Sequence, residues 1–438
     1  MFARFFSSPP GSGAAELELI PLRDGVPDQG SSTIDLLVRI QPPKPAQSPK
    51  RPPLNLCLVL DRSGSMAGAK LHGMLQAAHG VIDNLTAQDY LSVVVFDDNV
   101  KTIIPSQLVR NPASLHRTLN GVEHGGSTAL HAGWLEGATQ AAHKLDPGRL
   151  NRVLVLTDGE ANVGVVEPDA ICSDINGAAQ RGISCTTLGF GEGYNEVLLR
   201  SMASSGNGNH YLVETPEQLS GIFNQELGGL VSTIAQQVRF SWESAASVQV
   251  LTHLEKDKQG RLRLNDLIVG NPIVFLLRLT VAAGKSPQAT FCLEYQDLAS
   301  RSKHRQNGQL SLPALPRHQW LELPVNPLVQ EELELWQAAE ARAEATLALR
   351  QGESGRARQL IDDALHRIQQ LPASGRSLQH RGQLEELQAD IHNNRFSVAS
   401  KKAAMQSHSY SYSSSSSGPD LTPEELLRLL KEQGHLDS

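Results

Sequence analysis

Between residues 54 and 228, short apolar runs alternate with stretches whose apolar residues recur at helical spacing. The apolar runs cover 54–60, 91–96, 152–157 and 184–190, and the helical stretches cover 71–85, 129–144, 168–181 and 195–204. A continuously apolar strand must be buried on both faces, and helices between the strands supply that cover. The segment is therefore predicted to form an α/β domain with a doubly wound, mostly parallel sheet at 54–230. A last strand near 210–214 and a helix over 216–227 complete it.

The flanking segments alternate apolar and polar residues, as half-buried antiparallel strands do. Two such stretches, 16–20 and 33–40, precede the α/β domain, and about six follow it between 237 and 312. The later strands predict a β-sandwich at 231–325. The two early strands have no core of their own, so we predict that residues 1–53 join the sandwich and end in a proline-rich linker. The α/β domain is then an insertion between sandwich strands.

The C-terminal part is rich in Glu, Ala, Leu and Gln, and three stretches with apolar residues at helical spacing predict a helical domain at 326–398. Residues 399–420 contain a serine tract that cannot form a core, and they are predicted to be a disordered linker. Beyond it, a capping box and a leucine-rich face predict a short amphipathic helix at 421–438. That helix either docks on its own chain or binds a second protein.

Composition excludes several classes of protein. The formal net charge is −7 over 438 residues, which is too weak a bias to indicate a nucleic-acid partner. The four cysteines have no CxxC spacing, so we expect reduced thiols rather than a zinc site. The first residues contain no apolar stretch of signal-peptide length, and the run 267–283 is interrupted by Pro272 and Arg278. We therefore expect a cytoplasmic protein without membrane insertion.

Three loops carry the candidate site. Asp61, Ser63 and Ser65 follow the first predicted strand, Thr128 precedes a helix, and Asp158 ends a later strand. Loops after parallel strands meet at the carboxyl edge of the sheet, where α/β proteins bind ligands. The carboxylate and hydroxyls at alternate positions can face one cation. A site that offers only oxygen ligands favours Mg²⁺, Mn²⁺ or Ca²⁺ over zinc.

This pattern resembles the metal-ion-dependent adhesion site of the von Willebrand factor A (VWA) family. All five positions of that site are filled in family order, by Asp61, Ser63, Ser65, Thr128 and Asp158. The resemblance implies that the two serines, and in some members the threonine, ligate the cation directly, while the two aspartates act largely through water. It also implies that an acidic side chain of a partner protein completes the coordination.

The resemblance covers about residues 54–228. One branch of the VWA family contains the inter-alpha-trypsin inhibitor heavy chains, their bacterial counterparts and plant A-domain proteins. This chain is most similar to that branch in two segments, 61–71 and 125–134. We therefore expect a non-enzymatic, metal-dependent protein-binding module. The alternative is an accessory subunit of an intracellular multi-protein or AAA+ ATPase assembly. A lysine ammonium in place of the cation would contradict the site, although Lys70 itself is expected to have a solvent or packing role.

Enzymatic interpretations find little support in the same loops. The glycine-rich turn at 189–193 lacks the GxGxxG spacing and the Lys-Ser or Lys-Thr pair of a phosphate loop. His124-Gly125-Gly126 is similar to a fragment of a hydrolase oxyanion loop, but the chain has no GxSxG motif. We expect His124 to lie exposed beside the site, Trp134 to pack against the sheet, and Glu160 and Asn162 to lie at the rim.

Overall fold

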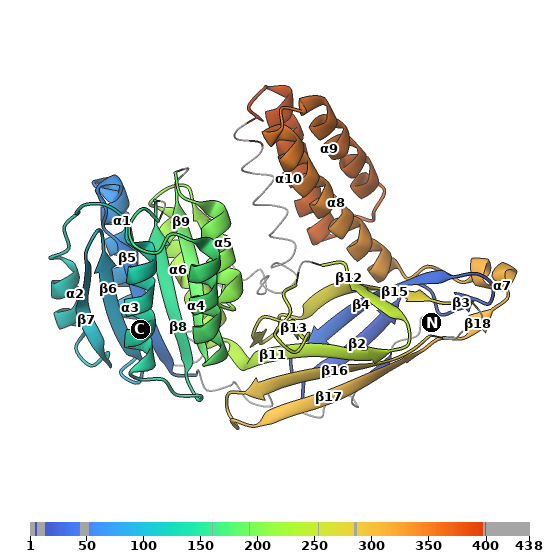
Figure 1. Cartoon of the computed structure of the whole chain (residues 1–438), viewed down its shortest axis with the longest axis horizontal. Helices are drawn as coiled ribbons and strands as arrows, with labels where there is room; N and C mark the ends of the chain where they lie inside the picture. The colour runs from blue at the N-terminus through green and yellow to red at the C-terminus, as the bar shows by residue number, and fades with distance from the viewer. Residues whose placement is uncertain are drawn as a thin grey trace.

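The computed structural model describes three parts, an α/β domain, a β-sandwich and a helical domain (Figure 1). The described residues are 5–6, 14–43, 52–159, 161–191, 193–252, 254–283, 287–396 and 399. Four predicted features lie wholly or mostly outside these residues. They are the proline-rich linker, the serine-rich segment, the C-terminal helix and Glu160. None of the helices within these ranges combines the length and apolar character needed to cross a bilayer.

The central sheet of the α/β domain has the strand order β10-β9-β8-β5-β6-β7. Its strands are β5 (Leu54–Asp61), β6 (Tyr90–Phe96), β7 (Val100–Leu108), β8 (Leu150–Thr157), β9 (Ile183–Phe190) and β10 (His210–Val213). All neighbours pair in parallel except β6 and β7. The side chains of β5 and β8 are buried throughout, as expected for strands covered on both faces.

Helices cover both faces of this sheet. One face packs against α1 (Ala69–Asn84), α2 (Pro112–Leu119) and α6 (Gln218–Val231), and the other against α3 (Leu130–Ala142), α4 (Pro168–Gln180) and α5 (Glu196–Ser205). Alternate residues of β5 enter the two cores, with Leu58 on the α1 side and Val59 on the α3 side. The prediction of a doubly wound, mostly parallel sheet is confirmed.

The sandwich consists of two antiparallel sheets around one apolar core. One sheet has the order β1-β2-β4-β15-β12, and the other has β13-β11-β16-β17, with β14 also paired to β11. The strands are β1 (Phe5–Phe6), β2 (Glu16–Pro21), β4 (Ser32–Gln41), β11 (Thr233–Ser244), β12 (Ser247–Val250), β13 (Leu262–Arg263), β14 (Leu267–Ile268), β15 (Ile273–Val281), β16 (Gln288–Asp297) and β17 (Lys303–Ser311). The aromatic centre is Phe240, whose ring lies 5.0 Å from that of Phe275 and 5.7 Å from that of Phe291.

Strands from both sides of the α/β domain share one sheet of the sandwich. β4 pairs with β15 from Ser32 opposite Val281 to Ile40 opposite Ile273. A separate two-stranded sheet joins β3 (Val26–Pro27) to β18 (Ala314–Leu315) in parallel, and α7 (Arg317–Glu322) follows. The early strands therefore bury their apolar faces in a core that is completed only by residues more than two hundred positions later.

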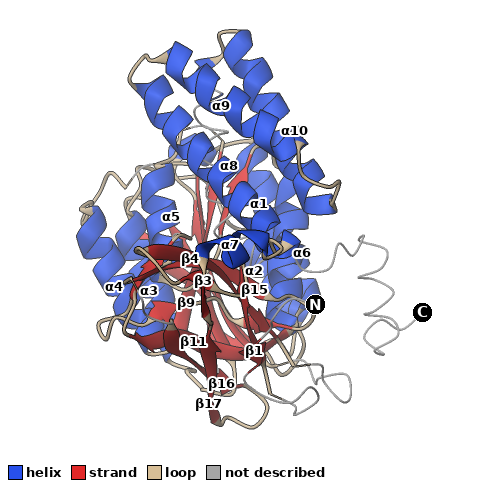
Figure 2. Cartoon of the chain, turned by 90° about the vertical axis from the view of Figure 1, so that its right-hand side faces the viewer, coloured by secondary structure: helices blue, strands red, loops and turns tan. Residues whose placement is uncertain are grey.

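The helical domain stands above the strands of the sandwich in Figure 2. Its helices are α8 (Pro327–Arg350), α9 (Ser354–Gln369) and α10 (Gly375–His392), and they enclose a core of alanine, leucine and isoleucine side chains. The first turns of α8 contact the outer face of the sandwich, where Val329 and Leu333 pack with Leu276. This contact joins the helical domain to the sandwich.

A buried arginine and histidine lie side by side in the helical domain. Arg342 is 0% exposed, and its guanidinium donates to His380 Nδ1 at 3.1 Å and to Gln383 Oε1 at 3.3 Å. Burial, together with the charges of Arg342 and Arg376, lowers the pKa of His380 to about 3. His380 is therefore neutral in the folded chain at every pH at which proteins are normally handled.

We expect acid to destabilise the helical domain through His380. Below the ordinary pKa of 6.5, the unfolded chain binds a proton at His380 that the folded chain does not, so the free energy of unfolding falls as the pH falls. At about pH 5 the loss is about 2 kcal/mol. Urea unfolding followed by circular dichroism at about pH 7 and about pH 5 measures it. His380→Gln, which cannot bind the proton, should lose less stability than the wild type, and equal losses would contradict the assignment.

Candidate metal centre

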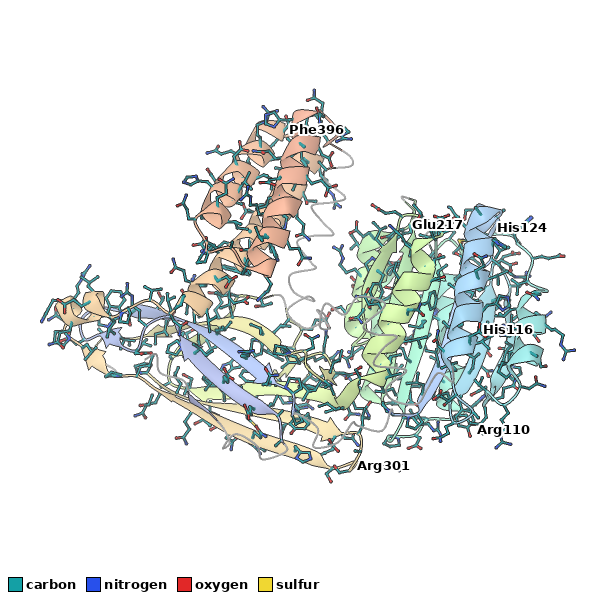
Figure 3. The ribbon with its side chains drawn as sticks, turned by 180° about the vertical axis from the view of Figure 1, so that it is seen from behind. Arg110, His116, His124, Glu217, Arg301 and Phe396 are labelled. Carbon is teal, nitrogen blue, oxygen red and sulfur yellow. The ribbon has the colours of Figure 1, made fainter. Side chains whose placement is uncertain are left out.

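The three candidate loops lie together at the carboxyl edge of the parallel sheet. Asp61 is the last residue of β5, Ser63 precedes the 3₁₀ turn η1 (Gly64–Met66), and Asp158 follows β8 directly. Backbone hydrogen bonds join the first two loops, with Gly64 N–H donating to Gly126 O at 2.9 Å. In Figure 3, His124 marks this end of the domain, and Arg110 lies at the opposite end. His124 is exposed, as expected, and so is Asn162 at the rim.

Three of the five predicted ligands contact one another directly. Ser63 Oγ lies 3.2 Å from Ser65 Oγ, and the Ser65 hydroxyl donates to Asp158 Oδ1 at 2.6 Å. The contact joins the first loop to the third, across 93 positions of sequence. The hydroxyls and one carboxylate oxygen thus form a cluster of donor atoms that could face a single ion.

The other two predicted ligands border this cluster. Asp61 Oδ1 accepts the backbone N–H of Ser63 at 2.7 Å, and Asp61 Oδ2 accepts the Thr157 hydroxyl. Thr128 abuts the third loop, because a Cβ added at Gly159 would lie 3.2 Å from Thr128 Oγ1. Asp61 is therefore held by the first loop and by the end of β8, whereas Thr128 reaches the site through packing against Gly159.

Most of the candidate ligands are buried. Asp61 is 0% exposed, Ser63 2%, Thr128 4% and Asp158 4%, whereas Ser65 is exposed. Burial raises the pKa of Asp61, and the hydrogen bonds from Thr157 and Ser63 oppose that rise. The carboxylate charge of Asp61 is therefore incompletely compensated within the protein. A divalent cation would supply the missing positive charge.

Lys70, in the first turn of α1, is an unexpected member of the site. Its ammonium lies 2.5 Å from Asp158 Oδ2 and 5.6 Å from the centroid of the Phe190 ring. The expectation of a mere solvent or packing role for Lys70 is therefore wrong. The ammonium contacts Oδ2, whereas the hydroxyl cluster lies at Oδ1. The structure thus places a lysine ammonium at Asp158 Oδ2, which was named in the sequence analysis as an observation against the site. The ammonium occupies only that edge of the carboxylate, because Ser65 contacts Oδ1.

The donor chemistry fits a hard divalent cation. The five predicted ligands offer two carboxylates and three hydroxyls, and all of these ligand atoms are oxygens. Within the described residues, no group of three or more His, Cys, Asp and Glu side chains is placed to hold a metal ion. A cation at this edge would therefore depend on the serine and threonine hydroxyls and on water, a combination typical of Mg²⁺, Mn²⁺ or Ca²⁺ rather than zinc.

Two carboxylates at this edge were missed in the sequence analysis. Asp97 and Asp98 follow β6, and a Cβ added at Gly125 would lie 1.8 Å from Asp97 Oδ2, while one at Gly126 would lie 2.1 Å from Asp98 Oδ1. Asp97 also pairs with Arg62 at 2.9 Å. Only glycines in the second loop allow this approach. The sequence signal is the same as for Asp61, namely a carboxylate directly after an apolar strand of a parallel sheet.

The parallel sheet with an oxygen-lined carboxyl edge defines an α/β binding domain of the A-domain class. Residues 55–225 match the family described as "von Willebrand factor type A domain". The chain therefore contains a VWA domain, and the predicted resemblance is confirmed.

Similar proteins occur in bacteria and in vertebrates. The chain is 36% identical to protein sll0103 of Synechocystis sp. over 199 residues, which cover 45% of this chain and 47% of that protein. It is 26% identical to YfbK of Escherichia coli over 306 residues, 65% of this chain and 53% of that protein. It is 30% identical to human inter-alpha-trypsin inhibitor heavy chain H3 over 164 residues, 36% of this chain and 18% of that protein. The chain thus spans about half the length of the two bacterial relatives.

Two solved structures share the fold beyond the VWA domain. The ArnB paralog VWA2 from Sulfolobus acidocaldarius has a TM-score of 0.65 at 14% identity, covering 92% of this chain and 98% of that chain. A von Willebrand factor type A protein from Catenulispora acidiphila has a TM-score of 0.60 at 15% identity, covering 82% and 89%. This coverage extends over more of the chain than the VWA domain alone.

Proposed function

We propose that this chain is a non-enzymatic binding protein that holds Mg²⁺, Mn²⁺ or Ca²⁺ at the carboxyl edge of its VWA domain and captures an acidic side chain of a partner protein. VWA domains are protein-interaction modules, and some members bind through a metal site. The observation that carries the proposal is the contact of Ser63, Ser65 and Asp158 beside the buried carboxylate of Asp61.

The residues of the site would have different roles in binding the cation and the partner. Ser63 and Ser65 would hold the cation through neutral hydroxyls, which leave most of its charge uncompensated. Asp61 and Asp158 would accept hydrogen bonds from its water ligands, and Thr128 would close the site from the second loop. When bound, the cation supplies a strong attraction for a carboxylate. The exposed position of Ser65 leaves that side open to a partner's Asp or Glu.

Manganese is a suitable probe for both parts of the proposal. Uptake of Mn²⁺ by the full chain is followed through the loss of the free-ion electron paramagnetic resonance signal. A peptide containing aspartate should then displace water from the bound ion and lower water-proton relaxation, whereas the same peptide with asparagine should not. Absence of uptake would contradict the metal site. Equal responses to the two peptides would contradict recognition of the partner through its acid group.

The helical domain favours a second candidate function, in which the chain is an accessory subunit that links a bound client to a larger assembly such as an AAA+ ATPase. Leu347 on α8 and Leu378 on α10 are large apolar side chains that are 55% and 54% exposed, so both are accessible to a partner. Recruitment through this domain should survive chelation by EDTA and be lost in Leu347→Ser/Leu378→Ser. Capture through the cation should show the opposite dependence.

We further propose that the chain works in the cytoplasm. All four cysteines lie within the described residues and are unpaired. Burial raises the pKa of Cys57 and of Cys185 to about 12, so these thiols are unreactive. Unpaired thiols suit a reducing compartment. Cell fractionation with an antibody against the chain tests this location.

A further inference from the structure

The ion pair between Lys70 and Asp158 lies inside the candidate metal centre. The Asp158 side chain is 0% exposed, and the Lys70 ammonium contacts its Oδ2 at 2.5 Å while Ser65 donates to Oδ1. We propose that Lys70 is an internal competitor of the divalent cation, which neutralises Asp158 when the cation is absent and lowers the affinity of the site for the cation. This inference rests on the proposed function, since it concerns the regulation of the same site.

Competition follows from the charges at the site. Asp61 and Asp158 contribute two negative charges, and Lys70 returns one positive charge to the same buried carboxylate that would help to hold the cation. Two cations near one carboxylate repel each other strongly where water is largely excluded. The bound ammonium therefore opposes cation binding both by occupying Asp158 and by its charge.

The position of Lys70 suits a reversible role. Its side chain is 35% exposed and extends from α1 to the buried Asp158 on the third loop. The Phe190 ring, with its centroid 5.6 Å from the ammonium, offers a cation–π contact that does not require Asp158. A lysine has a flexible stem, so the ammonium can leave the carboxylate without movement of the backbone.

The consequence is a site that remains ordered in two states. Without a divalent cation, Lys70 compensates the buried Asp158 and joins α1 to the loop after β8. With the cation, the same carboxylate turns to the ion and its water ligands. Because each state satisfies Asp158, occupancy should follow the cation concentration instead of being permanent.

The test compares Lys70→Met with Lys70→Arg and with a matched control, Lys144→Met. Lys144 also lies over an aromatic ring, 5.7 Å from the centroid of Tyr90. Tyr90 is the first residue of β6, whereas Asp158 follows the last residue of β8, so the two lysines lie at opposite edges of the parallel sheet. Calorimetry of Mn²⁺ binding to the full chain gives the affinity. Thermal unfolding in EDTA gives the stability of the cation-free chain.

We expect Lys70→Met to bind Mn²⁺ about tenfold more tightly than the wild type. In EDTA the same variant should unfold at a lower temperature, because Asp158 is then buried without a counter-charge. Lys70→Arg and Lys144→Met should keep the wild-type affinity. An unchanged or weakened affinity of Lys70→Met, with normal binding by the wild type, would overturn the role of Lys70 alone. Absence of Mn²⁺ binding by every variant would overturn the proposed function as well.

Discussion

Asp61→Ala is expected to lower the affinity of the chain for Mg²⁺ or Mn²⁺ by about 100-fold and to abolish cation-dependent binding of an acidic peptide. The variant removes one of the two carboxylates among the five predicted ligands, and both of these carboxylates are buried. The fold should be kept, because the raised pKa of Asp61 means that burial of its charge opposes folding. Asp61→Asn, whose Oδ1 can still accept the Ser63 N–H and whose Nδ2 can donate to the Thr157 hydroxyl, should show the same loss of affinity with still less effect on stability.

Calorimetry with Mn²⁺ and circular dichroism measure these two effects separately. A matched control is Asp89→Ala, because Asp89 is also 0% exposed but accepts the Leu54 and Thr86 N–H groups at 2.8 Å and 2.7 Å, at the start of β5 and away from the site. That variant should lose stability and keep its cation affinity. Tight cation uptake that survives the combined Asp61→Ala/Ser63→Ala change would show that the cation binds elsewhere.

Glu226→Ala is expected to destabilise the α/β domain by about 3–5 kcal/mol. Glu226 on α6 is 4% exposed, and its Oε1 accepts from Arg152 Nη1 of β8 at 2.7 Å. Its oxygens also accept from Thr186 at 2.8 Å and from Tyr211 at 2.8 Å. Truncation would leave the Arg152 guanidinium buried beside Asp266, whose Oδ2 lies 3.5 Å from Arg152 Nη2. The cost arises from that poorly compensated charge.

Urea unfolding of the full chain, monitored in the α/β domain, gives the change in free energy. Glu385→Ala is the control, since Glu385 forms an ion pair at 2.8 Å with Arg381 in which both side chains are 47% exposed. Removal of that exposed pair should change stability by less than about 1 kcal/mol. Similar changes in the free energy of unfolding for the two substitutions would show that burial does not make the Arg152–Glu226 pair more important for stability than an exposed pair.

The fold was largely predictable because the pattern of apolar and polar residues within each strand identifies the strand without information from the rest of the chain. The residues of β5 are apolar along their whole length, which indicates a strand covered on both faces, and β4 alternates as a half-buried strand does. The pairing of the strands depends on residues far apart in the sequence. β4 pairs with β15, which follows the entire VWA domain. The sequence indicated this pairing only because the early strands have no core of their own.

The site was predictable to a smaller extent. Asp61, Ser63 and Ser65 are close in sequence, and the topology of a parallel sheet brings Asp158 to the same edge. Asp97 and Asp98 obey the same rule and were overlooked, because no pattern of neighbouring hydroxyls marks them. The contact of Lys70 with Asp158 depends on how far a lysine stem reaches from the first turn of α1, which residue spacing does not reveal.

By itself, the sequence determined which segments are strands or helices and which loops carry oxygen ligands, because periodicity and polarity act over a few neighbouring residues. The tertiary structure decided which charges meet. Lys70 reaches Asp158 and Arg152 reaches Glu226 across separate elements. The free energy of each pair depends on distance and on exclusion of water, and both arise only when the elements pack together.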